Sequence, residues 1–181
     1  VLSHQVSYFT IIKESIFTLS KFFNIDDQYS FMLSDSTIIE MLNNGELKIS
    51  NFDPKSLTPN GYDLKVDEIY VESVGKTYSI GPKKFFIVLS MEYFVFPSDI
   101  YGQIWLRTTF ARKGIFISAG LIDAGFEGKL NIMSFNSSDN EIKIERGERY
   151  AQVIFMKLDR NPELPYKIRS GHYFGQNEII R

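Results

Sequence analysis

The sequence contains no cysteine and only two histidines, His4 and His172. Without thiols the chain has no disulfide bonds and no thiolate nucleophile. It also cannot build a zinc site from cysteine, which excludes the His/Cys/Cys site of the zinc nucleobase deaminases. Two histidines argue equally against a transition-metal centre made of imidazoles. Any chemistry of this chain therefore depends on its carboxylates, hydroxyls, amides and cationic side chains.

A concentrated charge of one sign and a long apolar run are also missing. The formal net charge is -2, with acidic and basic residues interspersed, so no basic stripe is available to neutralise a polymeric nucleic acid. The most apolar N-terminal stretch, residues 6–23, is interrupted by Lys13, Glu14 and Lys21. It therefore resembles neither a membrane span nor a signal sequence. We expect a soluble, cytoplasmic protein.

A chain of 181 residues is long enough for one domain with a substantial core. Residues 1–31 have apolar side chains at steps of three and four, which predicts an amphipathic helix. Ser34 or Ser36 then begins a shorter helix, which ends at Asn43-Asn44-Gly45. We predict an N-terminal helical extension over residues 1–31, followed by one domain over residues 32–181.

From Gly61 onward the pattern changes to short runs rich in Tyr, Phe, Ile and Val. Examples are Phe85-Phe-Ile-Val-Leu and Gln152-Val-Ile-Phe, and Gly, Pro, Asn and Asp separate the runs. The stretch Lys129-Leu-Asn-Ile-Met-Ser-Phe partly alternates, as expected for a half-buried strand. The pattern predicts an all-β barrel or jelly roll.

Three segments carry side chains suited to binding and chemistry. Residues 120–128, Gly-Leu-Ile-Asp-Ala-Gly-Phe-Glu-Gly, have the layout of a tight β-hairpin that presents backbone groups and Asp123. Leu106-Arg-Thr-Thr-Phe-Ala-Arg combines two guanidinium groups and two hydroxyls at the end of a strand, a set suited to phosphate oxygens. Gly171-His-Tyr-Phe-Gly-Gln forms a glycine-punctuated tail that is able to close over a ligand.

These segments resemble, in order, the motifs of the dUTPase and dCTP deaminase superfamily. The matching stretches are Gly61-Tyr-Asp-Leu, Arg107-Thr-Thr-Phe-Ala-Arg, the segment of residues 120–128, Arg149-Tyr-Ala-Gln and Tyr173-Phe-Gly-Gln. The resemblance covers residues 32–176. It implies a distorted β jelly roll, a β-clip barrel, that assembles as a homotrimer with active sites at subunit contacts. It also implies Mg²⁺ bound to the triphosphate of a nucleotide.

The resemblance assigns a role to each matching residue. Asp123 would orient the water that attacks the α-phosphorus, and Asp63 would contact magnesium through a water. The phosphate oxygens would be held by Arg107, Thr108, Thr109, Gln152, Tyr166, His172, Tyr173 and Gln176. The nucleobase and sugar would contact Arg112, Ala119, Gly120, Ile122 and Phe126, with Phe126 either lining the pocket or packing beneath it. His172 stands where deaminase-type relatives have a lysine.

One departure from the deaminase pattern decides between the two activities of the superfamily. Deaminases carry a glutamate in a pattern similar to I-x-L-E-F-x-N-S, and the matching stretch here is Leu130-Asn-Ile-Met-Ser-Phe-Asn-Ser. Met133 therefore stands at the glutamate position, and a thioether transfers no protons. We predict a dUTP diphosphatase. The alternatives are a dCTP deaminase or bifunctional enzyme, with Glu127 as substitute acid, and a non-catalytic nucleotide-binding protein.

Overall fold

The computed structural model describes residues 32–72, 74–118, 120–169 and 171–180. The helical extension expected in residues 1–31 lies outside this part of the chain, and so does Ala119. The extension and its boundary therefore stay predictions. Among the described residues, no helix has both the length and the apolar character needed to cross a membrane.

Strands make up most of the regular secondary structure of the described residues, which confirms the predicted all-β class. The strands are β1 (Lys48–Ile49), β2 (Leu57–Thr58), β3 (Gly61–Val71), β4 (Gly75–Lys76), β5 (Ser79–Ile80), β6 (Phe85–Val95), β7 (Ile100–Leu106), β8 (Ile115–Ser118), β9 (Leu121–Ile122), β10 (Glu127–Asn136), β11 (Ile142–Lys143) and β12 (Arg149–Lys157). The helices are α2 (Asp35–Asn44), α3 (Thr108–Ala111) and α4 (Tyr166–Arg169), with one 3-10 turn, η2 (Pro54–Ser56).

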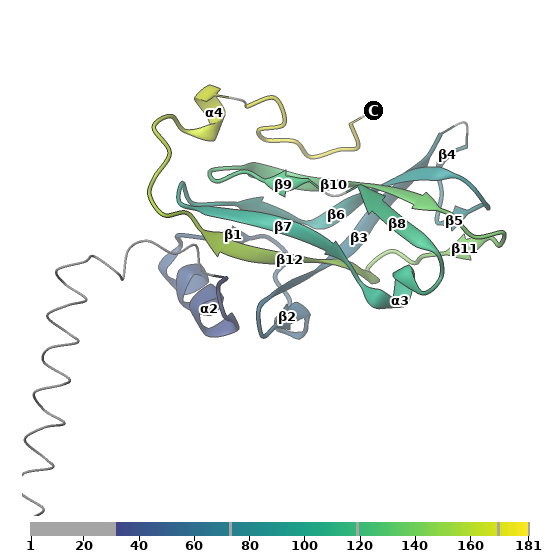
Figure 1. Ribbon diagram of the computed structural model, residues 1–181, viewed down its shortest axis with the longest axis horizontal. Helices are drawn as coiled ribbons and strands as arrows, with labels where there is room; N and C mark the ends of the chain where they lie inside the picture. Colours follow the sequence, from purple (N-terminus) through teal and green to yellow (C-terminus); the bar gives the residue numbers. More distant parts are fainter. Residues whose placement is uncertain (1–31, 73, 119, 170, 181) are drawn as a thin grey trace, which may run out of the picture. The chain divides into compact units, whose positions relative to one another are not determined.

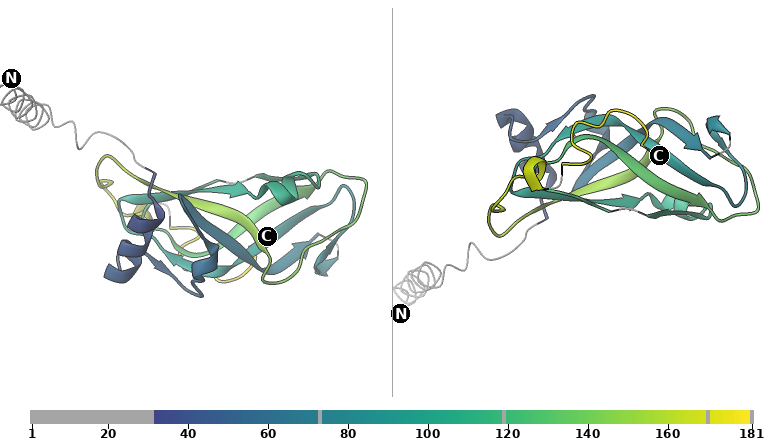
Figure 2. Two further views of the ribbon diagram at one scale, coloured as in Figure 1. Left: turned by 90° about the horizontal axis from the view of Figure 1, so that it is seen from below. Right: turned by 90° about the horizontal axis from the view of Figure 1, so that it is seen from above.

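The strands pair antiparallel in one large sheet with the order β8-β10-β6-β3-β12-β7-β9. Three short strands extend it, since β1 pairs with β6 while β2 and β4 pair with β3, and β11 and β5 form a small separate sheet. Figures 1 and 2 show the large sheet curling into a half-barrel, with β10 and β6 facing β7 and β12. This is the distorted jelly roll that the sequence predicts.

Alternating side chains of the strands build the core inside the curl, between the two halves of the sheet. Along β10 the side chains of Leu130, Ile132 and Ser134 are buried, whereas those between them are more exposed, as the alternation in the sequence predicts. Aromatic rings fill the interior, and Phe155 contacts Phe96 at 5.5 Å between ring centroids. Each buried apolar side chain of this size contributes roughly 1.5–3 kcal/mol to folding.

Helix α2 begins and ends where the sequence predicts. The hydroxyl of Ser34 accepts a hydrogen bond from the backbone N–H of Thr37 at 3.4 Å, which identifies Ser34 as the N-cap. At the other end, Gly45 adopts a left-handed conformation with φ 75° and its N–H bonds to the carbonyl of Leu42. Ile38 and Met41 bury the inner face of the helix.

The segment of residues 120–128 differs from the expected hairpin. Its turn is present, because the N–H of Phe126 donates to the carbonyl of Asp123 at 3.0 Å. However, the two strands that flank the turn do not pair with each other: β9 pairs with β7, and β10 pairs with β6 and β8. The turn therefore carries the chain from the half of the curled sheet that contains β7 to the half that contains β6.

Candidate functional site

One group of predicted site residues gathers where β3, β7 and β12 meet, and we name Asp63, Arg107, Arg149 and Gln152 the arginine cluster. Oδ2 of Asp63 lies 3.4 Å from Nε of Arg107 and 3.5 Å from Nη1 of Arg149. The side chain of Asp63 is only 7% exposed, and burial raises its pKa although the two guanidinium groups oppose that rise. One buried carboxylate thus orients two cations.

The backbone of β3 and β12 fixes this arrangement. Asp63 lies opposite Gln152 in the antiparallel register. The preceding Gly61 permits the close approach, because a Cβ atom at this position would collide with the carbonyl oxygen of Val153. Arg107 also donates from Nη1 to the carbonyl oxygen of Arg149 at 3.0 Å. The two arginines are therefore held together by main chain as well as by Asp63.

The remaining residues of this group lie at the surface beside the cluster. Thr108, Thr109 and Arg112 are exposed on α3 and at its end, so their side chains are free to meet a ligand. Gln152 is half-buried, and its amide nitrogen donates to the hydroxyl of Thr58. With two guanidinium groups to one carboxylate, the cluster has an excess of positive charge, which suits the oxygens of a phosphate chain.

A second group forms at the turn after β9, and we name Asp123, Phe126, Tyr166 and Gln176 the turn and tail group. Asp123 is exposed, Phe126 is buried, and the ring of Phe126 meets that of Tyr166 at a centroid distance of 6.0 Å in an edge contact. Phe126 therefore packs beneath the turn rather than lining an open pocket. Burial raises the pKa of Tyr166, and the charge of Asp123 adds to that rise.

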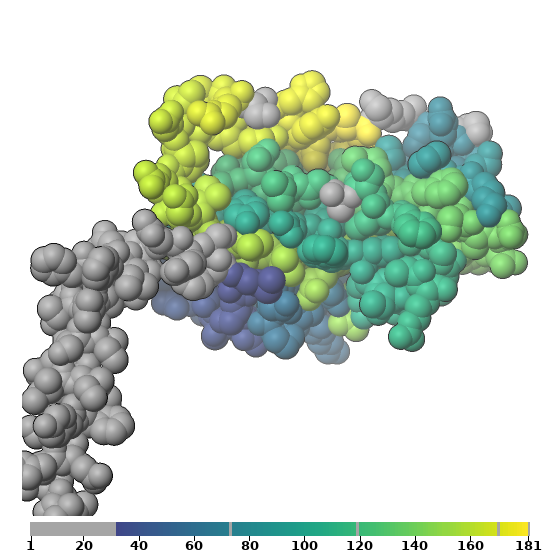
Figure 3. All heavy atoms as spheres, viewed as in Figure 1, coloured from purple at the N-terminus to yellow at the C-terminus, as the bar shows by residue number. Residues whose placement is uncertain are grey.

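The C-terminal tail lies along the first half of β10. Gly175 donates its N–H to the carbonyl of Glu127 at 2.7 Å, and Lys129 donates its N–H to the carbonyl of Gln176 at 2.8 Å. The amide nitrogen of Gln176 donates to the carbonyl of Lys129 at 2.6 Å. Figure 3 shows these yellow C-terminal residues lying on the green strand surface. The backbone of β10 thus holds Gln176 close to the turn that carries Asp123.

The other predicted residues of the second group divide between surface and core. His172 and Tyr173 are exposed on the tail, with their rings 4.7 Å apart. Gly120 is exposed, whereas the side chain of Ile122 is buried. Only the backbone of Ile122 is therefore available to a nucleobase.

The two groups lie apart in the chain. Ile122 on β9 pairs with Gly102 on β7, and Arg107 follows Gly102 by five residues, roughly 17 Å at about 3.3 Å per residue. Figure 1 places α3, which begins after Arg107, at the lower right of the sheet and α4, which carries Tyr166, at its upper left. A groove between them is lined by residues of β7, β8 and β9, including Trp105, Phe116 and Leu121. These three side chains are about 60% exposed, at 59%, 64% and 63%. Large apolar side chains gathered at a surface are typical of a protein contact.

Met133 lies on β10 with its side chain half exposed. Its cross-strand neighbours are Ile87 on β6 and Ser118 on β8. Glu127 is six residues earlier on the same strand, roughly 20 Å away at about 3.3 Å per residue. Its carboxylate accepts a hydrogen bond from the hydroxyl of Tyr93 at 2.8 Å. Within one chain, Glu127 is therefore too distant to act at the position of Met133.

Arg149 was not assigned a role from the sequence, although the motif that contains Gln152 begins with it. The structure places its guanidinium beside that of Arg107. The signal that could have identified Arg149 is its position at the start of the motif Arg149-Tyr-Ala-Gln, three residues before the predicted phosphate ligand Gln152.

Comparisons with known proteins agree on one family. The family model described as dCTP deaminase-like matches residues 65–158. A dCTP deaminase of Pyrococcus horikoshii is 34% identical over 143 residues, which cover 75% of this chain and 89% of that protein. A "dCTP deaminase, dUMP-forming" of Aquifex aeolicus is 31% identical and covers 82% and 92% of the two chains.

A viral relative and a solved structure complete the comparison. A "probable deoxyuridine 5'-triphosphate nucleotidohydrolase" of Sulfolobus islandicus rod-shaped virus 1 is 34% identical, and the match covers 82% of this chain and 96% of the viral protein. The crystal structure of a dCTP deaminase from Agrobacterium tumefaciens superposes with a TM-score of 0.62 at 19% identity. That match covers 71% of this chain and 48% of the bacterial one, and it shows the same fold.

Proposed function

This chain belongs to the dCTP deaminase-like family of nucleotide enzymes, and from that premise we propose that it hydrolyses dUTP to dUMP and pyrophosphate. The observation that carries the proposal is Met133. Deamination needs a group that takes a proton from water and gives it to the leaving amine, and neither Met133 nor its neighbours Ile87 and Ser118 is a competent acid or base. Hydrolysis of a phosphoanhydride makes no demand on that position.

Asp123 is the carboxylate that we assign to hydrolysis. It is exposed on the turn between β9 and β10, where a water molecule can reach it. In the proposed reaction, Asp123 accepts a proton as the water oxygen bonds to the α-phosphorus. The bond from that phosphorus to the bridging oxygen breaks, and pyrophosphate leaves. The turn holds Asp123 through the hydrogen bond between its carbonyl and the N–H of Phe126.

The arginine cluster is the group that we assign to the triphosphate. Arg107 and Arg149 place two guanidinium groups around one buried carboxylate, and Thr108 and Thr109 add exposed hydroxyls beside them. Such groups stabilise charge that develops on phosphate oxygens during the attack. Gln152 would add an amide donor after leaving Thr58.

Magnesium is part of this proposal through its bond to the triphosphate. Both ion pairs of Asp63 use Oδ2, so Oδ1 is the oxygen suited to accept a hydrogen bond from a metal-bound water. The ion would neutralise charge on the phosphate chain.

The residues before Asp123 would bind the nucleoside, and the tail would bind the phosphates. Gly120 and Ile122 would read the nucleobase through backbone groups, since the side chain of Ile122 is buried. Ala119 has the same proposed role and lies outside the described residues. Arg112, exposed after α3, would face the base or sugar. The tail, with Tyr166, His172, Tyr173 and Gln176, would close over the phosphates.

A complete site would require more than one copy of the chain. The arginine cluster and the turn and tail group lie apart within one chain, so a nucleotide would be held between the cluster of one copy and the turn of another. The exposed apolar side chains of Trp105, Phe116 and Leu121 would be buried in such a contact. We propose a homotrimer, as the resemblance implies.

A substitution at Asp123 tests the hydrolysis directly. We expect wild-type protein with Mg²⁺ to release pyrophosphate from dUTP, and Asp123→Asn to lose that activity by two orders of magnitude or more, the usual size of a general-base contribution (about 10²–10⁴). Asp139→Asn is a matched control, because Asp139 is an exposed carboxylate paired with Lys83. Equal activity of Asp123→Asn and wild type would contradict the assignment.

Deamination of dCTP, alone or followed by hydrolysis, is the second candidate, and the names of the archaeal and bacterial relatives favour it. In this case the proton transfers need a carboxylate other than Glu127 of the same chain, which lies too far along β10. Ammonia release from dCTP by the wild-type protein would establish this candidate. The Met133→Glu variant should then gain rate over the wild type if only the missing glutamate limits the reaction.

A further inference from the structure

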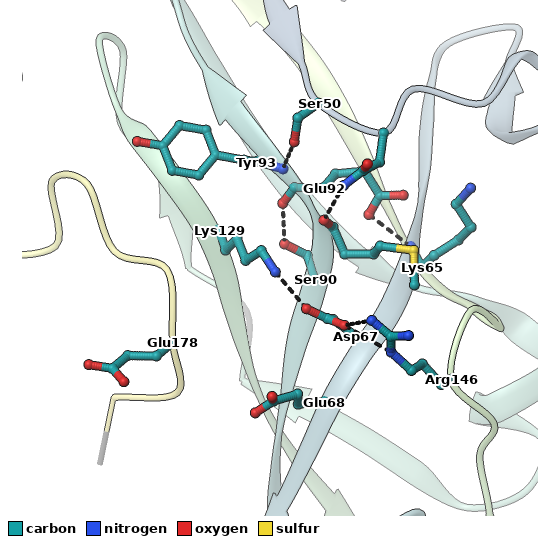
Figure 4. Close-up of polar contacts among 12 residues, drawn as sticks. Ser50, Lys65, Asp67, Glu68, Ser90, Glu92, Tyr93, Lys129, Arg146 and Glu178 are labelled. Carbon is teal, nitrogen blue, oxygen red and sulfur yellow. Dashed lines mark hydrogen bonds and ion pairs between the residues drawn. The ribbon is translucent and has the colours of Figure 1, made fainter.

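Asp67 occupies an irregular point in β3 that the proposed reaction does not use. The pairing of β3 with β6 shifts register between Val66 and Glu68, so Asp67 is the extra residue of a β-bulge. The pairing of β10 with β6 also shifts, between Lys129 and Asn131. Such bulges redirect side chains. Here the bulge turns the carboxylate of Asp67 toward cations from two other parts of the chain, as Figure 4 shows.

Asp67 makes one ion pair on each of its two carboxylate oxygens. Oδ2 lies 2.5 Å from Nζ of Lys129 on β10, and Oδ1 lies 2.6 Å from Nη2 and 3.0 Å from Nε of Arg146. The side chains of Asp67 and Lys129 are only 15% and 19% exposed. Burial alone raises the pKa of Asp67, but the hydrogen bonds from Lys129 and Arg146 outweigh it and lower the pKa. The carboxylate is therefore ionised near neutral pH.

The contact with Lys129 leads to the tail. The backbone N–H and carbonyl of Lys129 are the groups that hold Gln176, through bonds of 2.8 and 2.6 Å. The side chain of Lys129 forms the ion pair with Asp67, so Asp67 holds the residue that binds Gln176. A shift of Lys129 therefore moves the backbone against which the tail docks.

The contact with Arg146 leads to the arginine cluster. Arg146 lies in the turn between β11 and β12, and Gly147 of that turn donates its N–H to the carbonyl of Val66 at 2.7 Å. Arg149, two residues after Gly147, is the first residue of β12. Asp67 thus fixes the turn from which the second guanidinium of the cluster projects.

From this geometry we propose that Asp67 is a positioning residue that orders both halves of the nucleotide site, the tail through Lys129 and the arginine cluster through Arg146. The inference rests on the proposed function for what the site binds. It concerns a residue that touches no substrate. Because the two halves of one protomer would serve different nucleotides in an oligomer, Asp67 would tie neighbouring sites together.

Amide hydrogen exchange reports separately on the contacts of Asp67 with Lys129 and with Arg146, and it needs no enzymatic turnover. The amide of Gly175, bonded to Glu127, reports on the tail, and the amide of Gly147, bonded to Val66, reports on the turn before Arg149. Asp67→Asn should accelerate exchange at both amides. Lys129→Met should accelerate exchange mainly at Gly175, and Arg146→Met mainly at Gly147.

Two further variants separate positioning from loss of fold. Asp67→Glu keeps the charge and should restore most of the protection. Glu68→Gln is a matched control, because Glu68 is the neighbour of Asp67 on β3 and forms an ion pair at 2.7 Å with Lys76 on β4, which leads to neither half of the site. It should leave both amides unchanged. Far-UV circular dichroism and gel filtration establish that each variant is folded and assembled.

Kinetics with dUTP add the functional readout. Asp67→Asn should raise KM by roughly two- to thirtyfold, the size expected of a residue that acts on the site through its neighbours, with a smaller change in kcat. Acceleration at only one of the two amides, or at neither, would overturn the proposal. If Asp67→Asn loses protection at both amides but the wild-type protein turns over no dUTP, the proposed function is refuted and the role of Asp67 is supported.

Discussion

Glu92 provides a prediction that depends on the fold alone. Its side chain is fully buried on β6, and Oε2 accepts a hydrogen bond from the backbone N–H of Lys65 at 3.0 Å (Figure 4). Among the described residues its other oxygen, Oε1, has no hydrogen-bond partner. Burial raises the pKa of Glu92 from its ordinary 4.5 to about 7, although the charges of Lys65 and Lys129 oppose this.

The raised pKa makes stability depend on pH with a definite sign. The folded chain keeps a proton on Glu92 up to about pH 7, whereas the unfolded chain releases it near pH 4.5. The proton therefore stabilises the fold fully below pH 4.5, and this stability is lost as pH rises toward 7. At about 1.4 kcal/mol per pKa unit, the difference corresponds to about 3 kcal/mol.

Glu92→Gln removes the titrating group and keeps the shape of the side chain. The difference in free energy of unfolding between variant and wild type should shift by about 3 kcal/mol in favour of the variant between pH 4.5 and 8. Urea denaturation at fixed protein concentration, followed by circular dichroism at several pH values, measures it. The other titrating groups contribute equally to both proteins, so their contributions cancel in the difference between the two free energies of unfolding. Parallel curves of unfolding free energy against pH for the two proteins would show that Glu92 does not bind a proton in the folded chain near neutral pH.

Three further predictions concern the arginine cluster, the apolar groove and the approach of β3 to β12. Arg149→Met should raise KM for dUTP by roughly tenfold in steady-state assays, with partial recovery in Arg149→Lys; an unchanged KM would remove Arg149 from the site. Trp105→Asp should dissociate the oligomer in sedimentation velocity, and an intact oligomer would place the contact elsewhere. Gly61→Ala should cost about 2 kcal/mol or more in urea unfolding, because its Cβ would meet the Val153 carbonyl, and unchanged stability would contradict so close an approach of the two strands.

Local features of the fold could be predicted because their causes are local. Ser34 caps α2 and Gly45 ends it through side-chain and backbone preferences that a few residues determine. The alternation along β10 similarly records which side chains face the core. The turn after Asp123 was also predicted, but the partners of its flanking strands were not. Strand pairing depends on contacts between distant residues, which no short pattern specifies.

The candidate site shows the same limit. Asp63, Arg107 and Gln152 were identified from the sequence, and the structure brings them together with Arg149. The network around Asp67 could not be predicted, since it depends on a bulge in β3 that brings together residues far apart in the chain. The roles assigned to the site residues rest on the resemblance, and the substitutions above test them.

In the function that we propose, this chain hydrolyses dUTP and does not deaminate dCTP. The most direct test incubates the wild-type protein with Mg²⁺ and either dUTP or dCTP, and measures pyrophosphate and ammonia in parallel. We expect pyrophosphate from dUTP and no ammonia from dCTP. Ammonia from dCTP would contradict it, because a proton-transfer group would then have to act where Met133 stands.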